Sequence, residues 1–418
     1  MSETSMFAPL KIKSYRNLFL GQFFSDFGGF LDIIALNILI IYVWELGPAY
    51  TAALLVIFSI PIVFIGPFTA VWVDRLPKKT VMLVCDLLRV GIAVALVFAA
   101  NVYMLYALVF LKITFGAIFD PARQSLIRHT VPEQYLLQAS SLGQILMNLV
   151  KIIAPAVGSA LMLVTEPKTL FIMEAIGFAI SAFFILGIPS LNEVKSSSPK
   201  KESPFLAELK EGFSYIRSNY LLNFSIFSLS AGMFLIFLYE ALFTPWAKSM
   251  GFLQSELGYI MTANGLGTVI GAIVIGKWTF WKNSPLHMML YSGIVSGLFV
   301  SLFGFGSLEV LVLPKTAWIL VFLIIGFTGA GAFVPFGYIL QKETPSTLMG
   351  RVAGTSNSIL NLAMFIGPVV GGLLATWLGS SFVFIGSGLL LTLYTTVVMV
   401  FINKKQRVIV QGEIKEFV

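Results

Sequence analysis

The sequence predicts an all-α integral membrane protein in which twelve transmembrane helices form two bundles of six, and three observations support this. Of 418 residues, 57% are hydrophobic, only 11% are charged, and the apolar runs are long. A helix of about 20 residues crosses a hydrocarbon core about 30 Å thick. Soluble domains carry about 25% charged residues, so this chain has too few polar groups for a surface that faces water. Soluble enzymes and nucleic-acid-binding domains are therefore excluded.

Each expected helix is an apolar run bounded by charged or turn-forming residues. In chain order the predicted spans are residues 17–43, 50–73, 80–100, 103–120, 136–164, 168–188, 221–246, 255–276, 286–307, 313–338, 350–377 and 379–402. No cleavable leader is expected, because Lys11, Lys13 and Arg16 lead directly into the first span. That span is also too long for the hydrophobic region of a signal peptide.

The basic residues predict the orientation of the chain. Loops on the cytoplasmic side of a membrane protein carry an excess of Lys and Arg. At the loops on the side opposite the amino terminus there are only Lys168, Lys248 and Lys315, the first and last of them at the ends of predicted spans. We therefore expect a multi-pass protein of the cell membrane with both termini in the cytoplasm. The net charge of +7 reflects this topology, and no nucleic-acid partner is expected.

The chain is expected to divide into four parts. An N-terminal bundle (1–188) is followed by a cytoplasmic linker (189–220), a C-terminal bundle (221–403) and a cytoplasmic tail (404–418). The second part of the linker has apolar residues at helical spacing: Leu206, Leu209, Phe213 and Ile216. That pattern is typical of an amphipathic helix, which either lies at the membrane surface or packs on a bundle.

The two predicted bundles resemble each other in sequence. A shift of 213 residues aligns Pro155 with Pro368 and Gly158 with Gly371. Parallel repeats of this kind occur in secondary transporters, where substrate binds between the halves near the membrane midplane.

Short motifs add a family resemblance that covers residues from about 15 to 403. After the second span, Asp74-Arg75 and the pair Lys78-Lys79 resemble the loop signature of the major facilitator superfamily, with Ala70 and Pro77 in place of two glycines. Lys112, four residues before Gly116, is similar to the family's Arg-x-x-x-Gly element. The run Gly367-Pro368-x-x-Gly371-Gly372 is similar to its antiporter element, normally placed in the fifth helix.

Further motifs are similar to the macrolide-efflux and enterobactin-exporter branch of that family. They are Asp120-Pro121-Ala122, Val131-Pro132-Glu133 and the run from Leu340 to Val352. The resemblance implies the major facilitator fold and transport by alternating access. It also implies that Lys112 lies where the family often keeps a basic residue linked to proton movement.

Two sets of motif residues receive structural roles. The first is a conformational latch, in which Asp74 caps the helix that begins near Arg351 and Arg75 pairs with Asp120; alternatively, Arg75, Lys78 and Lys79 are only positive-inside anchors. Anions are stabilised at helix amino ends by about 0.3–1 kcal/mol. The second set consists of small or kinking residues that allow close helix packing: Pro155, Gly158, Gly367, Pro368, Gly371 and Gly372.

Ionisable residues within spans are costly, so each is a functional candidate. Seven residues are candidates for the proton-coupling site and the substrate cavity: Asp26, Asp32, Asn37, Lys112, Lys151, Glu174 and Glu240. Asn37 is included because it lies on the same helix stripe as Asp26. Six helical steps separate Asp26 from Asp32 by about 120°, so one face of the helix cannot hold both. A local irregularity at Gly28 and Gly29 could aim both inward. Asp86 and Arg89 are expected to stabilise loop contacts instead.

The sequence therefore predicts a secondary active transporter that exports amphipathic small molecules, such as drugs, macrolides or siderophore-like compounds, by proton-coupled antiport. The alternative is a lipid or lysophospholipid flippase of the same fold. A membrane sensor or intramembrane enzyme is a third class, but no convergent nucleophile and base support an enzyme. The expected partners are the substrate, protons and membrane lipids. We expect a monomer with no cofactor and no metal, since Cys85 is the single cysteine and there are two histidines.

Overall fold

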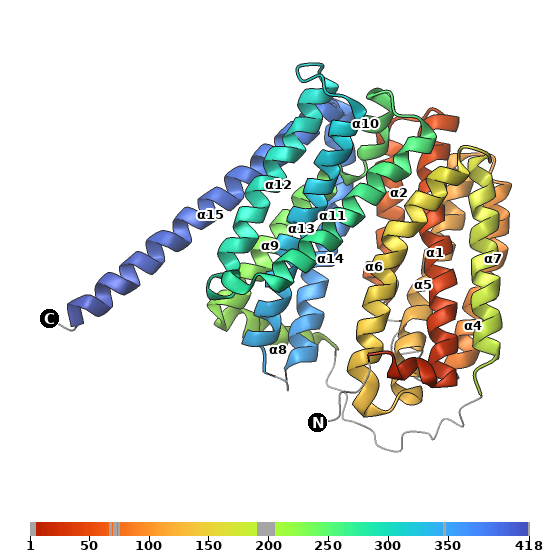
Figure 1. Ribbon diagram of the computed structural model, residues 1–418, viewed down its shortest axis with the longest axis horizontal. Helices are drawn as coiled ribbons and strands as arrows, with labels where there is room; N and C mark the ends of the chain where they lie inside the picture. The colour runs from red at the N-terminus through yellow and green to blue at the C-terminus, as the bar shows by residue number, and fades with distance from the viewer. Residues whose placement is uncertain are drawn as a thin grey trace. The chain divides into compact units, whose positions relative to one another are not determined.

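The computed structural model describes residues 6–66, 69, 73, 76–189, 205–345 and 348–416. Within these ranges there is no strand, and twelve helices are long and apolar enough to cross a membrane (Figure 1). The spans are Lys13–Val43, Pro48–Ile65, Lys78–Val97, Val102–Thr130, Glu133–Leu161, Pro167–Leu186, Tyr220–Glu240, Gln254–Lys277, Pro285–Ser307, Lys315–Glu343, Met349–Leu378 and Ser380–Asn403. The all-α class and the twelve predicted spans are confirmed.

Two predicted boundaries differ from the structure for clear reasons. Helix α5 (Val102–Thr130) continues past its expected end at residue 120, although Pro121 lies inside it. A proline removes the N–H that would bond to the carbonyl four residues earlier, and here the Thr69 hydroxyl donates to the Ala117 carbonyl at 3.2 Å. The predicted span 221–246 is instead two helices, α9 (Tyr220–Glu240) and the short α10 (Phe243–Ser249).

The chain folds into two compact units. The first contains residues 1–201 and 247–262, and the second contains residues 202–246 and 263–418. The predicted C-terminal bundle thus includes a segment, 247–262, that belongs to the first unit. In that segment the Lys248 ammonium donates to the Ile41 carbonyl at 2.8 Å, and the Gly258 N–H donates to the Ser159 hydroxyl at 2.8 Å.

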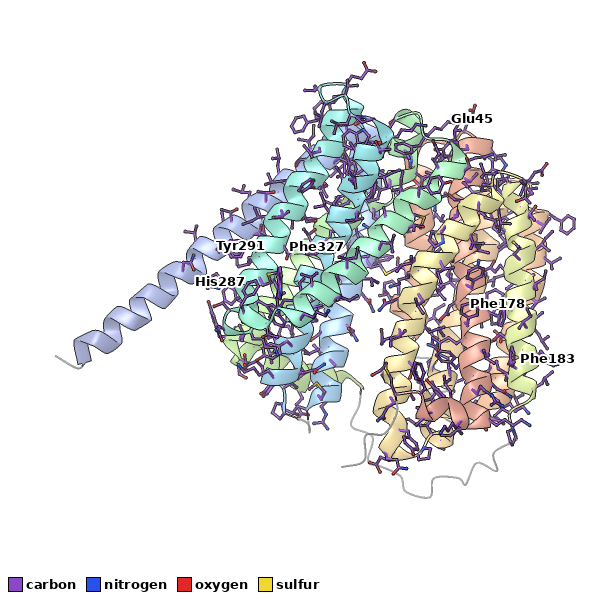
Figure 2. All side chains as sticks on the ribbon, viewed as in Figure 1. Glu45, Phe178, Phe183, His287, Tyr291 and Phe327 are labelled. Carbon is purple, nitrogen blue, oxygen red and sulfur yellow. The ribbon has the colours of Figure 1, made fainter. Side chains whose placement is uncertain are left out.

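The first unit is built from helices α1 (Lys13–Ile38), α2 (Pro48–Ile60), α4 (Lys78–Val97), α5, α6 (Leu136–Leu161) and α7 (Pro167–Leu186). Small residues bring α1 close to its neighbours. A Cβ added to Gly177 of α7 would lie 2.5 Å from the Phe24 carbonyl oxygen. A Cβ on Gly158 of α6 would lie 2.8 Å from Ile34. Among the large side chains of α7, Phe178 is buried in the unit and Phe183 is exposed (Figure 2).

The second unit contains α8 (Phe205–Ser218), α9, most of α11 (Leu257–Lys277), α12 (Pro285–Ser307), α13 (Lys315–Glu343), α14 (Met349–Leu378) and α15 (Ser380–Glu416). Helices α9 and α14 pack closely because α14 presents glycines to α9. A Cβ on Gly371 would lie 1.9 Å from the Leu238 carbonyl oxygen, and one on Gly367 would lie 2.5 Å from the Phe237 Cβ. Pro368 and Gly372 are buried in the same helix, and Pro155 lies inside α6.

This packing predicts that Gly371→Ala lowers the free energy of unfolding by about 1–3 kcal/mol, the usual cost of overpacking. The added methyl group has no room against the Leu238 backbone, so α9 and α14 must separate. Gly354→Ala on the same helix is the control, because nothing lies within 4 Å of its added Cβ. Thermal unfolding of the purified protein measures both. Equal melting temperatures for the two variants would contradict the assigned contact.

Helix α8 contains the predicted amphipathic pattern and packs on its own unit. Ile216 is fully buried, and a Cβ on Gly212 would lie 2.3 Å from the Thr355 hydroxyl of α14. Arg351 donates to Glu211 at 2.6 Å. Of the two alternatives for this segment, the helix packed on a bundle therefore describes it. At the chain's end, α15 continues through the predicted tail to Glu416 and projects beyond the other helices of its unit (Figure 1).

Candidate functional site

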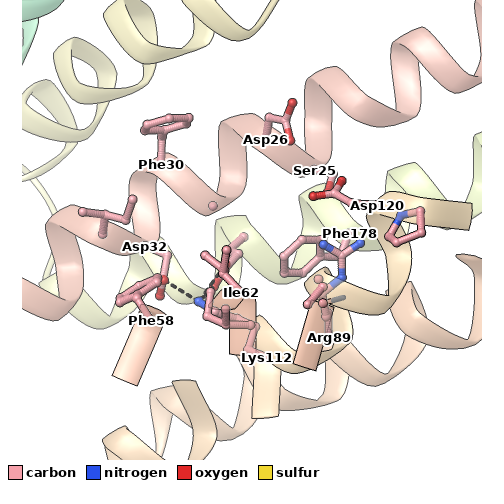
Figure 3. Close-up of a pocket in the computed structure, with 18 residues that line it drawn as sticks. Ser25, Asp26, Phe30, Asp32, Phe58, Ile62, Arg89, Lys112, Asp120 and Phe178 are labelled. Carbon is pink, nitrogen blue, oxygen red and sulfur yellow. Dashed lines mark hydrogen bonds and ion pairs between the residues drawn. The ribbon is translucent and has the colours of Figure 1, made fainter. Parts of the chain in front are cut away.

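A cavity of about 560 Å³ lies inside the first unit, between α1, α2 with the turn that follows it, α4, α5 and α7 (Figure 3). Most of its wall is apolar, with the aromatic rings of Phe30, Phe58 and Phe178. Its charged lining residues are Asp26, Asp32, Arg89, Lys112, Asp120 and Glu174. Amphipathic ligands fit a site of this kind, because apolar walls supply contact area and a few polar groups fix orientation.

Three of the predicted residues form one buried cluster, which we call the triad: Asp32 of α1, Lys112 of α5 and Glu174 of α7. The Lys112 ammonium donates to Glu174 Oε1 at 2.9 Å and to Oε2 at 3.2 Å, and it also bonds to Asp32 Oδ2. None of the three side chains is more than 4% exposed. The other oxygen of Asp32, Oδ1, has no hydrogen-bond partner among the described residues.

The triad is unbalanced in charge. One ammonium faces two carboxylates, so the cluster has a net charge of −1 when both acids are ionised. An uncompensated charge in a protein interior is costly. Binding one proton, or one cation, would make the cluster neutral. Such a group can therefore hold a proton in one state of the protein and release it in another.

Glycine determines how closely the triad can assemble. A Cβ on Gly28 would lie 2.9 Å from the Glu174 Cα, so only a glycine lets α1 and α7 approach to this distance. Lys112 reaches both acids from α5 through its four-carbon side chain. The sequence marked all three residues as candidates, and the structure brings them together although Asp32 and Glu174 lie 80 and 62 residues from Lys112 along the chain.

Asp26 lies at the other end of the cavity (Figure 3) and accepts a hydrogen bond from Gln22 at 3.1 Å. Arg123, Asp120 and Arg89 lie within electrostatic range of it. The irregularity suggested at Gly28 and Gly29 is absent, because α1 is α-helical from Lys13 to Ile38. The cavity reaches around the helix instead, over Gly29, which has no side chain to block it.

Asp86 and Arg89 of α4 form a second buried pair, which the sequence analysis assigned wrongly to loop contacts. The Arg89 guanidinium bonds to Asp86 and lies 4.4 Å from the ring centres of both Phe119 and Phe178. Asp86 also accepts a hydrogen bond from Ser181 at 2.7 Å. The available signal was an acid and a base three residues apart in an apolar span, which places them on one helix face.

Three other candidates do not line this cavity. Asn37 donates to the Ile33 carbonyl of its own helix at 2.9 Å. Lys151 is exposed on α6 of the first unit. Glu240 is exposed at the end of α9 in the second unit. A charged residue in a span is therefore a candidate, but the direction of its side chain decides whether it joins a site.

The four predicted latch residues that the structure describes make contacts within their own units. Asp74 and Arg75 lie outside the described residues. Lys78 donates to the Leu76 carbonyl at 3.0 Å, and Lys79 donates to the Leu186 and Ile188 carbonyls at 3.0 and 2.5 Å. Lys79 thereby satisfies carbonyls at the end of α7, a favourable place for a cation.

The remaining two latch residues also have partners. Asp120, whose side chain is 65% exposed, pairs with Arg123 one helical turn later at 3.0 Å. Arg351 pairs with Glu211 of α8. These contacts give both residues local structural roles.

Comparison with known proteins agrees with the fold and the predicted branch. The family model described as Major Facilitator Superfamily matches residues 18–368. The uncharacterized MFS-type transporter YfiS of Bacillus subtilis (strain 168) is 25% identical over 396 residues, covering 93% of each chain. Macrolide efflux protein A of Streptococcus pyogenes is 25% identical over 354 residues, covering 79% of this chain and 82% of its own.

Among solved structures, the nucleoside transporter NupG has the same fold. It superposes with a TM-score of 0.72 at 16% identity, over 93% of this chain and 99% of its own. The twelve apolar helices and the family match identify an integral, multi-pass membrane protein. The chain belongs to the major facilitator superfamily and is a transporter, not an enzyme.

Proposed function

We propose that this transporter exports amphipathic small molecules in exchange for protons by alternating access, and that the triad is its proton-binding group. The observation that carries the proposal is the cluster of two carboxylates and one ammonium, buried in the wall of an aromatic cavity. The proposal also keeps the predicted orientation, with both termini in the cytoplasm.

The charge of the triad explains how exchange could work. A proton neutralises the cluster, and so does the positive group of a bound substrate. Both together would leave the triad and its ligands with a charge of +1 in the protein interior, which is as costly as the negative one. Proton and cationic substrate should therefore bind in alternation, which is the requirement for antiport.

The lining of the cavity supports an amphipathic substrate with a cationic group. Phe30, Phe58 and Phe178 offer apolar contact area and ring faces, and a cation over an aromatic face gains about 0.5–2 kcal/mol. The name of one relative, macrolide efflux protein A, also favours export of a bulky molecule.

The test is substrate-induced proton movement in proteoliposomes that contain a pH-sensitive dye. A panel of cationic dyes, macrolides, siderophores and lysolipids is added under an imposed pH gradient, with protein-free liposomes as the control. We expect cationic amphipathic compounds to dissipate the gradient only when the protein is present. Transport of lysolipids that is independent of the gradient, with no response to the other compounds, would contradict the proposal and support the flippase alternative.

A further inference from the structure

We propose that the second unit binds the phosphate group of an anionic phospholipid in a pocket that is separate from the transport cavity. The pocket, which we call the basic pocket, has a volume of about 230 Å³ and lies between the ends of α9, α12 and α13. Its polar lining residues include Tyr220, Lys282, Ser284, His287, Tyr338 and Lys342. The proposal does not depend on the transported substrate or on proton coupling.

Two lysines give the basic pocket its charge. The ammonium groups of Lys282 and Lys342 lie 5.9 and 5.7 Å from the centre of the same Tyr338 ring. Neither lysine forms an ion pair with a carboxylate in the part of the chain that the structure describes. Glu343, which follows Lys342, does not line the pocket and accepts a hydrogen bond from Asn219 at 3.1 Å. The pocket therefore holds two positive charges without a matching anion.

The amino end of α12 adds to this positive field. The helix has 23 residues and begins at Pro285, and no side chain caps its first turn. The amino end of a helix carries a partial positive charge that attracts anions. Here the contribution is that field, since Pro285 has no N–H and the His287 N–H donates to the Ser284 carbonyl at 3.1 Å. His287 also lines the pocket, and its Nε2 lies 2.8 Å from Asn403 Oδ1. Two ammonium donors and the positive field of a helix amino end around one cavity suit a phosphate.

The position of the pocket favours a phosphate that belongs to a lipid. Three membrane spans have ends that line it, Tyr220–Glu240, Pro285–Ser307 and Lys315–Glu343, so the pocket lies where hydrocarbon meets water. In the connection that leads from Lys277 to Pro285, Trp278 and Phe280 are 66% and 70% exposed. Exposed aromatic residues at this level are typical of the membrane interface. Basic pockets between transmembrane helices bind acidic lipid head groups, whereas free phosphate would gain nothing from the aromatic residues.

The experiment measures lipid binding to the full-length protein in detergent. Wild type and the double variant Lys282→Gln/Lys342→Gln are titrated with fluorescent phosphatidylglycerol, with phosphatidylcholine and with inorganic phosphate. The control variant is Lys210→Gln/Lys277→Gln, which removes two exposed lysines of the same unit that do not line the pocket. All four lysines are exposed, so folding of the variants, checked by thermal unfolding, should be preserved.

We expect the double variant to bind phosphatidylglycerol about 30-fold more weakly than wild type, since each lysine near acidic lipid contributes a factor of about five. The control variant should stay close to wild type, and phosphatidylcholine should bind weakly to all three proteins. Equal losses in both double variants would overturn the proposal, because they would indicate general surface charge. Inorganic phosphate that competes at concentrations comparable to the lipid would overturn the assignment to a lipid.

Discussion

Replacing Lys112 with methionine is expected to lower the free energy of unfolding by about 3–5 kcal/mol, the usual cost of removing one partner from a buried ion pair. The substitution leaves the carboxylates of Asp32 and Glu174 facing each other in the interior without a cation. Methionine is close to lysine in length, so the loss would report the charge rather than a cavity. Thermal unfolding in detergent at neutral pH measures the effect.

The matched control for this variant is Lys151→Met. Both lysines lie in apolar spans, but Lys151 is exposed on α6, so its replacement should change the melting temperature little. A second-site change, Glu174→Gln, should restore part of the stability of Lys112→Met because it removes one of the two unpaired charges. The assignment of Lys112 as the counter-ion fails if Lys112→Met and Lys151→Met melt at the same temperature.

The second large effect concerns coupling. Asp32→Asn is expected to abolish substrate-induced proton movement and to weaken the binding of a cationic substrate, because the triad is then neutral without either ligand. The substitution keeps the volume of the side chain and leaves Lys112 and Glu174 as a balanced pair, which no longer needs a proton for neutrality. Glu174→Gln should have the same effect through the remaining Asp32–Lys112 pair.

The coupling control is Asp120→Asn. Asp120 lines the same cavity, but its side chain is 65% exposed and pairs with Arg123, so the charge of the triad is unchanged. Proton movement is followed with an internal dye in proteoliposomes, and substrate binding is followed by fluorescence quenching of the same preparations. Proton movement by Asp32→Asn at the wild-type rate would remove Asp32 from the site.

The sequence predicted the spans well because a membrane permits few backbone structures. Every backbone group in hydrocarbon must be paired internally, so an apolar run of the right length forms a helix. Prediction failed where a distant side chain changes the local rule. The fourth span was expected to end at residue 120, but α5 continues through Pro121, with the Thr69 hydroxyl shared between the Gly66 carbonyl at 2.9 Å and the Ala117 carbonyl, which the proline leaves free, at 3.2 Å. Nothing in the sequence near Pro121 identifies that partner.

The site was predicted only in part. Asp32, Lys112 and Glu174 were recognisable one by one, since charge is rare within spans, and the same criterion selected Lys151 and Glu240, which the structure shows exposed. To separate the buried residues from the exposed ones, one must know which side of each helix faces the bundle. The sequence does not show this, because a helix face that borders lipid is as apolar as a face that packs on other helices. Arg89 was assigned to a loop because it lies near a span end, yet the rings of Phe119 and Phe178 hold it in the cavity wall.

The unequal number of acids and bases in the triad also bears on membrane voltage. Moving one elementary charge across the whole bilayer changes the energy by about 2.3 kcal/mol for each 100 mV. The deprotonated cluster has a net charge of −1 and responds to that field, whereas the protonated cluster is neutral and does not. In the proposed exchange the triad carries a proton in one half of the cycle and a cationic substrate in the other, so it is neutral in both halves. A resting potential would therefore act only on the deprotonated triad without substrate, and turnover by exchange would depend on acidity rather than on voltage.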